Sequence, residues 1–220
     1  MWVAWGDGPA RIVPDGNADL VWSGRRLLVA GYDTTPQWVD RAAAPVSLGV
    51  RLRPGQLSVL ARLPASELVD QRIPLDEILG ASTTRPLEER MSHAADPGAE
   101  LDELAAQLLA HDDSTTVAET TAVRDRLASG ATVASVAGGL GWSERRLHRF
   151  CVEWYGFGPK LLHQILRFRH AYELLGSGAP IAATATRSGF SDQAHLHRAV
   201  RRFADTTPGC QLPHGHQHEA

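Results

Sequence analysis

The sequence lacks the features that mark membrane, secreted and metal-binding proteins. No apolar run among its 220 residues approaches the roughly 20 that span a bilayer. The segment Met1–Gly6 has neither the charged start nor the long apolar centre of a signal peptide. The two cysteines, Cys151 and Cys210, form no metal-ligand pair and no disulfide framework. We therefore expect a cytoplasmic protein with no membrane contact, metal or cofactor.

Catalytic groupings are missing as well. No Ser/His/Asp or Cys/His arrangement has supporting context, and residues 1–114 contain no cysteine. Asp15, Asp19 and Asp33 are typical of turns and caps more than of an acidic site. We expect no catalytic centre, so the chain is predicted not to be an enzyme.

Charge is distributed unevenly along a chain whose composition is otherwise ordinary. With 43% hydrophobic and 21% charged residues, the sequence is typical of a globular protein, and its net charge is −3. Residues 1–114 hold 10 Lys/Arg against 17 Asp/Glu, whereas residues 115–212 hold 12 against 7. A positive segment suits the phosphate backbone of DNA, and an acidic one does not.

The first part of the chain, residues 1–85, is rich in proline, glycine and short apolar pieces. Arg26–Ala30 and Val46–Leu52 lie between turn formers and predict strands. Pro64–Val69 and Pro74–Leu79 predict short helices that begin at proline. The pattern indicates a small β-rich domain with little helix.

Residues 86–113 are predicted to be a linker with one helix. The stretch 81–97 is weakly patterned, and the helix at about 99–111 places Leu101, Leu104 and Leu108 on one face. That face suits dimerisation and domain docking equally.

The rest of the chain, residues 114–212, is patterned as helix almost throughout. Residues 213–220 are predicted to be a loose tail. The alternating histidines of this tail are a weaker indication of a metal site.

A short pattern occurs twice in the basic region. An alanine lies four residues before a glycine in each copy, Ala137 before Gly141 and Ala185 before Gly189. Two helices joined by a short turn cross closely, so the crossing needs a small side chain. The turn needs a residue that tolerates positive φ. The pattern predicts two helix-turn-helix units, with two ordinary helical hairpins as the alternative.

The residues after each glycine predict how the second helix of each unit begins. Ser143 and Asp192 are placed to cap that helix through their side-chain oxygens. Leu147 and Leu196 return to the core, and a His-Arg pair follows each leucine. The second copy has one more residue between its glycine and its leucine.

Residues at this spacing resemble the AraC/XylS transcription regulators. The resemblance covers roughly residues 115–212. Its matching positions are Val133-Ala134, Ala137, Gly141, Ser143, Arg145, Leu147, Arg149, Gly156, Gly158-Pro159-Lys160, Arg167-Phe168, Ala171, Leu174-Leu175, Gly189–Gln193, His195-Leu196, Arg198 and Thr207-Pro208. It implies an all-α domain over 114–212, in which one long helix at about Pro159–Leu175 joins two helix-turn-helix units.

Three segments nearer the N-terminus resemble the small cupin-like domain of some of these regulators. They are Pro14–Trp22, Gly31–Pro36 and Gly49–Gly55. The expected fold class is α+β, with a β-rich N-terminal domain followed by the all-α domain. The resemblance identifies no ligand-binding residues.

The resemblance also implies how DNA is read. Recognition helices at about 144–155 and 192–203 are expected to enter successive major-groove segments about 34 Å apart. Because their side chains differ, the DNA site is expected to be asymmetric. The residues expected at the DNA are Ser143, Arg145, Arg146, His148, Arg149, Gln193, Ala194, His197 and Arg198.

Individual side chains suggest base contacts. Arg145 and Arg149 suit guanine, with phosphate contact or solvation as the alternative. In the second helix Gln193 suits adenine, Ala194 a thymine methyl group and Arg198 guanine. The alternative for Arg198 is a structural role within its subdomain.

Three positions depart from the family pattern. Thr184 stands where an apolar residue is usual, and Cys151 and Val200 stand where phenylalanine is usual. The first helix of the second unit is therefore polar. We expect the second unit to be the less stable one and the first to do most of the base reading.

Double-stranded DNA is the expected partner, with RNA polymerase, a small-molecule effector and a second copy of the chain as further candidates. Trp5, Trp22, Trp38 and Tyr32 suit either a small effector pocket or plain core packing. Two other functions stay open. One joins DNA binding to a catalytic or damage-sensing N-terminal domain, and the other is a scaffold whose hairpins bind protein.

Overall fold

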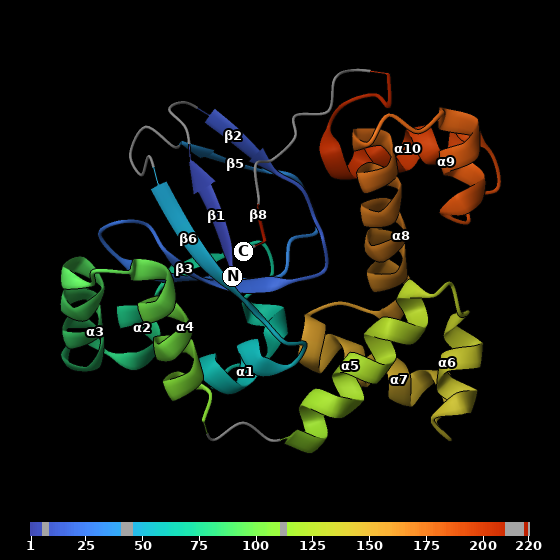
Figure 1. Cartoon of the computed structure of the whole chain (residues 1–220). Coiled ribbons are helices and arrows are strands. Elements are labelled where there is room, and N and C mark those ends of the chain that lie inside the picture. The colour runs from blue at the N-terminus through green and yellow to red at the C-terminus, as the bar shows by residue number, and fades with distance from the viewer. Residues whose placement is uncertain (6–8, 41–45, 111–113, 210–217, 220) are drawn as a thin grey trace.

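The N-terminal part of the chain supplies all but one strand of an antiparallel sheet that has six strands among the described residues (Figure 1). The computed structural model describes residues 1–5, 9–40, 46–110, 114–209 and 218–219. The strands of the sheet are β1 (Trp2–Trp5), β3 (Ala18–Trp22), β4 (Leu27–Ala30), β6 (Val46–Leu52), β7 (Arg72–Pro74) and β8 (His218–Glu219), in the order β7-β4-β3-β6-β1-β8. A separate ribbon pairs β2 (Pro9–Ile12) with β5 (Gln37–Asp40).

The strands at Leu27–Ala30 and Val46–Leu52 confirm the sequence prediction. The two residues of β8 lie against β1, so this part of the C-terminal segment is not the loose tail that was expected. The rest of that tail lies outside the described residues, as does Cys210.

Short helices accompany the sheet. They are α1 (Gln56–Ala61), the 3-10 turn η2 (Ala65–Glu67), α2 (Leu75–Leu79), α3 (Ala81–His93) and α4 (Pro97–Leu108). Helix α4 packs on β6 and α3, with Leu101 and Leu104 fully buried. Leu101 and Leu104 therefore dock within the chain, which is one of the two uses expected of this face.

Helix α3 corrects the prediction of a weakly patterned linker at 81–97. Its inward face consists of Thr84, Leu87 and Met91, at i, i+3 and i+7. Threonine begins this stripe and Pro86 lies within the helix, so the apolar period is weak in the sequence. The helix forms because its inward face packs on the rest of the fold.

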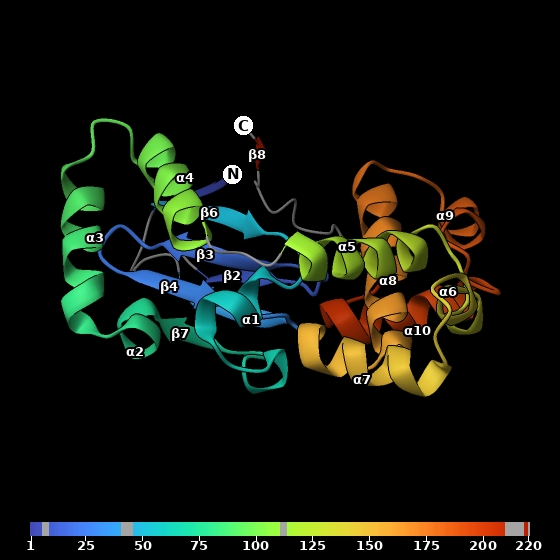
Figure 2. The same cartoon turned by 90° about the horizontal axis from the view of Figure 1, so that it is seen from below.

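Six helices make up residues 114–209, the described stretch of the C-terminal part. They are α5 (Ser114–Ala128), α6 (Val133–Gly139), α7 (Glu144–Tyr155), α8 (Pro159–Gly176), α9 (Ile181–Arg187) and α10 (Gln193–Ala204). Helix α8 runs from the pair α6 and α7 to the pair α9 and α10 (Figures 1 and 2). The fold is thus the predicted β-rich part followed by a helical part. None of the described helices is both long and apolar enough to cross a bilayer.

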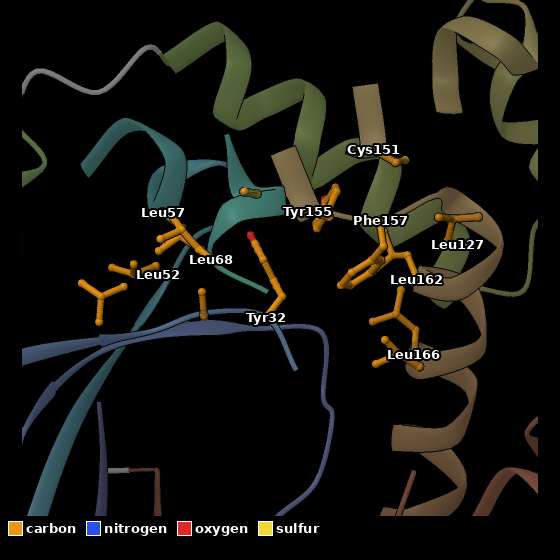
Figure 3. Packing of buried hydrophobic residues seen from close by; sticks show 14 of the residues in the cluster. Tyr32, Leu52, Leu57, Leu68, Leu127, Cys151, Tyr155, Phe157, Leu162 and Leu166 are labelled. Atoms are coloured by element: carbon orange, nitrogen blue, oxygen red, sulfur yellow. The ribbon is translucent and has the colours of Figure 1, made fainter. Parts of the chain in front are cut away.

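One hydrophobic core runs through both parts, and Tyr32 lies at the junction (Figure 3). Its side chain is 1% exposed, and its ring centroid lies 5.4 Å from that of Tyr155 and 6.2 Å from that of Phe157. The hydroxyl of Tyr155 donates to the backbone oxygen of Thr120 at 2.6 Å. Tyr155 is the last residue of α7. Tyr32, which lies two residues after strand β4, therefore contacts the end of this helix directly.

Helix α8 is held to the sheet part by a close backbone approach. Gly16 has φ +74°, and a Cβ placed there would lie 3.1 Å from Cδ2 of Leu166. Any larger residue would therefore be strained in backbone conformation and crowded against α8.

Polar contacts border this apolar junction. Arg124 donates to Asn17 Oδ1 at 3.2 Å, and Arg169 lies 3.9 Å from an Asp15 carboxylate oxygen. The hydroxyl of Thr120 donates to the backbone oxygen of Pro54 at 2.6 Å. The two parts are therefore joined through α5 and α8 as well as α7.

The N-terminal aspartates form ion pairs within the fold. Asp33 receives two hydrogen bonds from Arg72, at 2.9 and 2.6 Å, and Asp15 lies 3.1 Å from Arg51. Asp19 accepts from the indole N–H of Trp2 at 2.9 Å. Burial, and next the neighbouring Asp15, raise the pKa of Asp19 to about 6.

Replacing Tyr32 by alanine should lower the free energy of unfolding by about 3–5 kcal/mol, because it leaves a cavity between the two parts. Urea denaturation measures the loss. Trp38→Ala is the matched control, since Trp38 is 63% exposed and should change stability by less than about 1 kcal/mol. A loss below about 1 kcal/mol for Tyr32→Ala would contradict the shared core.

Asp19 should make stability depend on pH. Its pKa is raised in the folded state, so its contribution is fully present below about pH 4 and is lost as the pH rises through about 6. Asp19→Asn stays neutral, so its stability relative to the native protein should rise by roughly 1–3 kcal/mol between pH 4 and 7. Urea unfolding at both pH values tests this, and an unchanged difference would refute it.

Candidate nucleic-acid interface

Both predicted turns have the same backbone geometry. The N–H of Trp142 donates to the oxygen of Ala137 at 2.9 Å, and the N–H of Phe190 donates to that of Ala185 at 2.9 Å. The two alanines are buried at the helix crossings. Gly141 has φ +66° and Gly189 has φ +70°, which are left-handed conformations that glycine adopts without strain. The structure confirms two helix-turn-helix arrangements, α6–α7 and α9–α10.

The second helix of each unit begins at a capping side chain, as predicted. Ser143 Oγ accepts from the N–H of Arg146 at 3.2 Å, and Asp192 Oδ1 accepts from that of His195 at 2.6 Å. This hydrogen bond is the largest cause that lowers the pKa of Asp192. The extra residue of the second copy, Ser191, lies before the cap and so does not alter the register of the helix.

The nine residues expected at the DNA are all exposed on α7, α10 or their caps. They are Ser143, Arg145, Arg146, His148, Arg149, Gln193, Ala194, His197 and Arg198. Leu147 and Leu196 are fully buried on the opposite side of their helices. Each helix therefore has a buried face and a free outward face.

Two of the exposed side chains of the first unit are held by neighbours. The guanidinium carbon of Arg146 lies 4.5 Å from the ring centroid of Trp142. The ring of His148 lies against Gly158. A Cβ placed at that glycine would be only 2.9 Å from His148 Nε2. Arg145 and Arg149 share one exposed face at i and i+4.

His195 also packs within its own unit. Its ring meets that of Phe190 edge-on at 5.1 Å, and its Nδ1 lies 3.2 Å from Ser191 Oγ. It corresponds in position to Arg146, which packs on Trp142.

Arg167 is a residue whose role the sequence did not indicate, although it lies in the segment that resembles the family. From α8 it donates to the backbone oxygens of Ser188, at 3.2 Å, and of Gly189. Its guanidinium carbon lies 4.5 Å from the ring centroid of Phe190. It thus ties the turn of the second unit to the connecting helix.

The two positions where the family usually has phenylalanine lie in the core, which also contains aromatic pairs in both units. Cys151 and Val200 are both fully buried. Burial raises the pKa of the Cys151 thiol to about 12, so it behaves as a small apolar group. Phe203 lies 5.2 Å from Phe168 between ring centroids, and Phe150 lies 4.9 Å from Trp142.

Three of the four aromatic residues considered for an effector pocket have described side chains, and these three do not gather in one place. Trp22 and Tyr32 belong to the core, whereas Trp38 is exposed beneath Arg11, at 5.7 Å. Nothing is described of the Trp5 side chain. Core packing is confirmed for Trp22 and Tyr32. No cluster of three His, Cys, Asp or Glu suited to a metal occurs in the described part of the chain.

The first helix of the second unit buries polar groups. Thr184 is 0% exposed and Ser188 is buried, and neither hydroxyl has a hydrogen-bond partner among the described residues. A buried hydroxyl without a partner costs stability. This agrees with the expectation that the second unit is the less stable.

Thr184→Val should raise the free energy of unfolding by about 1 kcal/mol, because valine has nearly the same shape and no hydroxyl to desolvate. Thermal or urea unfolding measures the gain. Thr186→Val is the control on the same helix, since Thr186 is exposed. A loss of stability in Thr184→Val would show that the hydroxyl is satisfied in solution.

Two family models match the chain. The family described as "Helix-turn-helix domain" matches residues 136–211, and the one described as "Domain of unknown function (DUF6597)" matches residues 1–74. The sequence matches no curated protein at a significant level.

Among solved structures, the chain is similar to the crystal structure of ToxT from Vibrio cholerae O395, with 10% identity, 94% of each chain covered and a TM-score of 0.51. A 1.65 Å structure of Vibrio cholerae ToxT has 11% identity, the same coverage and a TM-score of 0.47. ToxT bound to (E)-4-(8-methylnaphthalen-1-yl)but-3-enoic acid has 12% identity, 94% and 91% coverage and a TM-score of 0.44. At such identities the first similarity establishes the fold alone.

The matched helix-turn-helix family extends from α6 across α7 and α8 to the end of the second unit. It therefore covers both turns, both caps and both exposed helices. The match shows that residues 136–211 form a helix-turn-helix domain, which implies a DNA partner, and the similarity to the first ToxT structure shows a shared fold.

Proposed function

We propose that the chain is a DNA-binding transcription regulator of the AraC/XylS type. In this proposal α7 and α10 are the two recognition helices, and one monomer reads two successive major-groove segments of an asymmetric site. The main observation behind this proposal is that both helices begin at equivalent caps and expose equivalent faces. The basic charge of residues 115–212 supports binding to phosphate. Helices placed in this way suit the major groove.

Arg145 and Arg149 are the proposed guanine readers of α7, because both are exposed at i and i+4 and neither lies over an aromatic ring of a described residue. Arg146 is held on Trp142 and is better placed for phosphate. His148 lies beside them, and Ser143 contributes its cap and a hydroxyl near the backbone.

In α10 the proposed readers are Gln193 for adenine, Ala194 for a thymine methyl group and Arg198 for guanine. His197 flanks them as His148 does in α7. The buried hydroxyls of Thr184 and Ser188 have no hydrogen-bond partner among the described residues, which lowers the stability of this unit. We therefore propose that the second unit contributes less to base reading than the first.

Residues 1–85 are proposed as the regulatory part and 114–212 as the DNA-binding part, joined by 86–113. This proposal is supported by direct contacts between the two parts. Tyr32 contacts the end of α7, and Gly16 lies close against α8. An effector that moved the sheet part would move both helices. RNA polymerase, a small-molecule effector and a second copy are further proposed partners, in the cytoplasm.

Arg149→Ala should weaken binding to a selected site by about 1–3 kcal/mol and relax preference at one base position, because a bidentate guanine contact is lost. A gel shift with a specific and a scrambled duplex, repeated at several salt concentrations, measures both effects.

Arg25→Ala is the matched control, since Arg25 is an exposed arginine in a turn of the sheet part. It should leave affinity and preference unchanged. An equal loss on every DNA sequence in Arg149→Ala, with a salt slope reduced by about one, would instead make Arg149 a phosphate contact.

A further inference from the structure

We infer that the two half-sites of the DNA target have the same base at one position and different bases at a second position. The second position faces Arg145 in one half-site and Ala194 in the other. This inference rests on the proposed function.

The caps set a common register for the two helices. Counting from Ser143 and from Asp192, the fourth residue is Leu147 in α7 and Leu196 in α10, and both are fully buried. The residue that lengthens the second copy precedes its cap. Residues at equal distance from the cap therefore occupy equivalent places on the two helices.

The two helices carry the same side chains at the fifth and sixth positions. His148 and Arg149 in α7 correspond to His197 and Arg198 in α10, and all four are exposed. Two arginines at one register present the same bidentate donor to a base pair. The two half-sites should therefore share a guanine at the base that these arginines face.

At the second position the helices differ most in chemistry. Arg145 and Ala194 lie one turn before Arg149 and Arg198, on the same exposed face. Arginine suits guanine, whereas the methyl side chain of alanine suits the methyl group of thymine. This position should tell the half-sites apart and so fix the direction in which the monomer lies on DNA.

The neighbouring positions are less suited to this discrimination. At the third, Arg146 and His195 are both packed on the aromatic residue of their turn. At the first, Glu144 and Gln193 are exposed at the start of the helices, three residues before the buried leucines and so to one side of the face that the arginines share. The second position remains at the centre of the outward face.

Selection of bound duplexes from a random-sequence pool, with the full chain, tests the inference. The native protein should enrich two segments about one helical turn apart that share a guanine and differ at a second position. Ala194→Arg should bring guanine to that position of the second segment, with a preference change on the order of ten-fold. Arg145→Ala should lose guanine from the first segment alone.

Ala118→Arg, on the exposed side of α5, is the matched control because it adds the same charge away from both recognition helices. It should leave the enriched sequences unchanged. Enrichment by the native protein with no change in Ala194→Arg, or with no shared guanine, would overturn the inference while the proposed function stands. Failure of the native protein to enrich any sequence would overturn the proposed function itself.

Discussion

The packing of Tyr32 against Tyr155 and Phe157 is the contact on which the arrangement of the molecule depends. Tyr155 closes the first recognition helix, and Phe157 lies in the short connection to α8. Both rings are buried, Tyr32 of the sheet part packs against them, and Gly16 brings α8 close to the same junction. The N-terminal part thus does more than accompany a DNA-binding unit. It completes the core beneath the first unit and fixes the start of the helix that carries the second.

Local chemistry made the helical part predictable from the sequence. A glycine that needs positive φ, an alanine at a crossing and a capping oxygen each act within a few residues, so Gly141, Ala137 and Ser143 indicate a turn without knowledge of the rest. The strands were harder to predict. β1, β2, β5 and β7 have three or four residues each, and their partners lie far along the chain. Helix α3 was missed because packing on the fold, and not its sequence period, decides it.

The candidate interface was predictable in its exposed face but not in its supports. Helical spacing from the cap places Arg145 and Arg149 outward, and the structure agrees. Helical spacing does not predict contacts between segments that lie apart in the sequence. Arg167 reaches the turn of the second unit from α8, and His148 meets Gly158 across the end of its own helix. These contacts separate side chains that are free to reach DNA from those that hold the units in place.

The shared core is tested most directly by native-state hydrogen exchange on the full chain. If the sheet part completes the core of the first unit, the slowest amides of β4, the last turn of α7 and the first turns of α8 should open together. They should then show one free energy of exchange and one dependence on denaturant. Amides of α7 and α8 that stay protected under conditions where β4 has already opened would contradict this account. The first unit would then have an independent core.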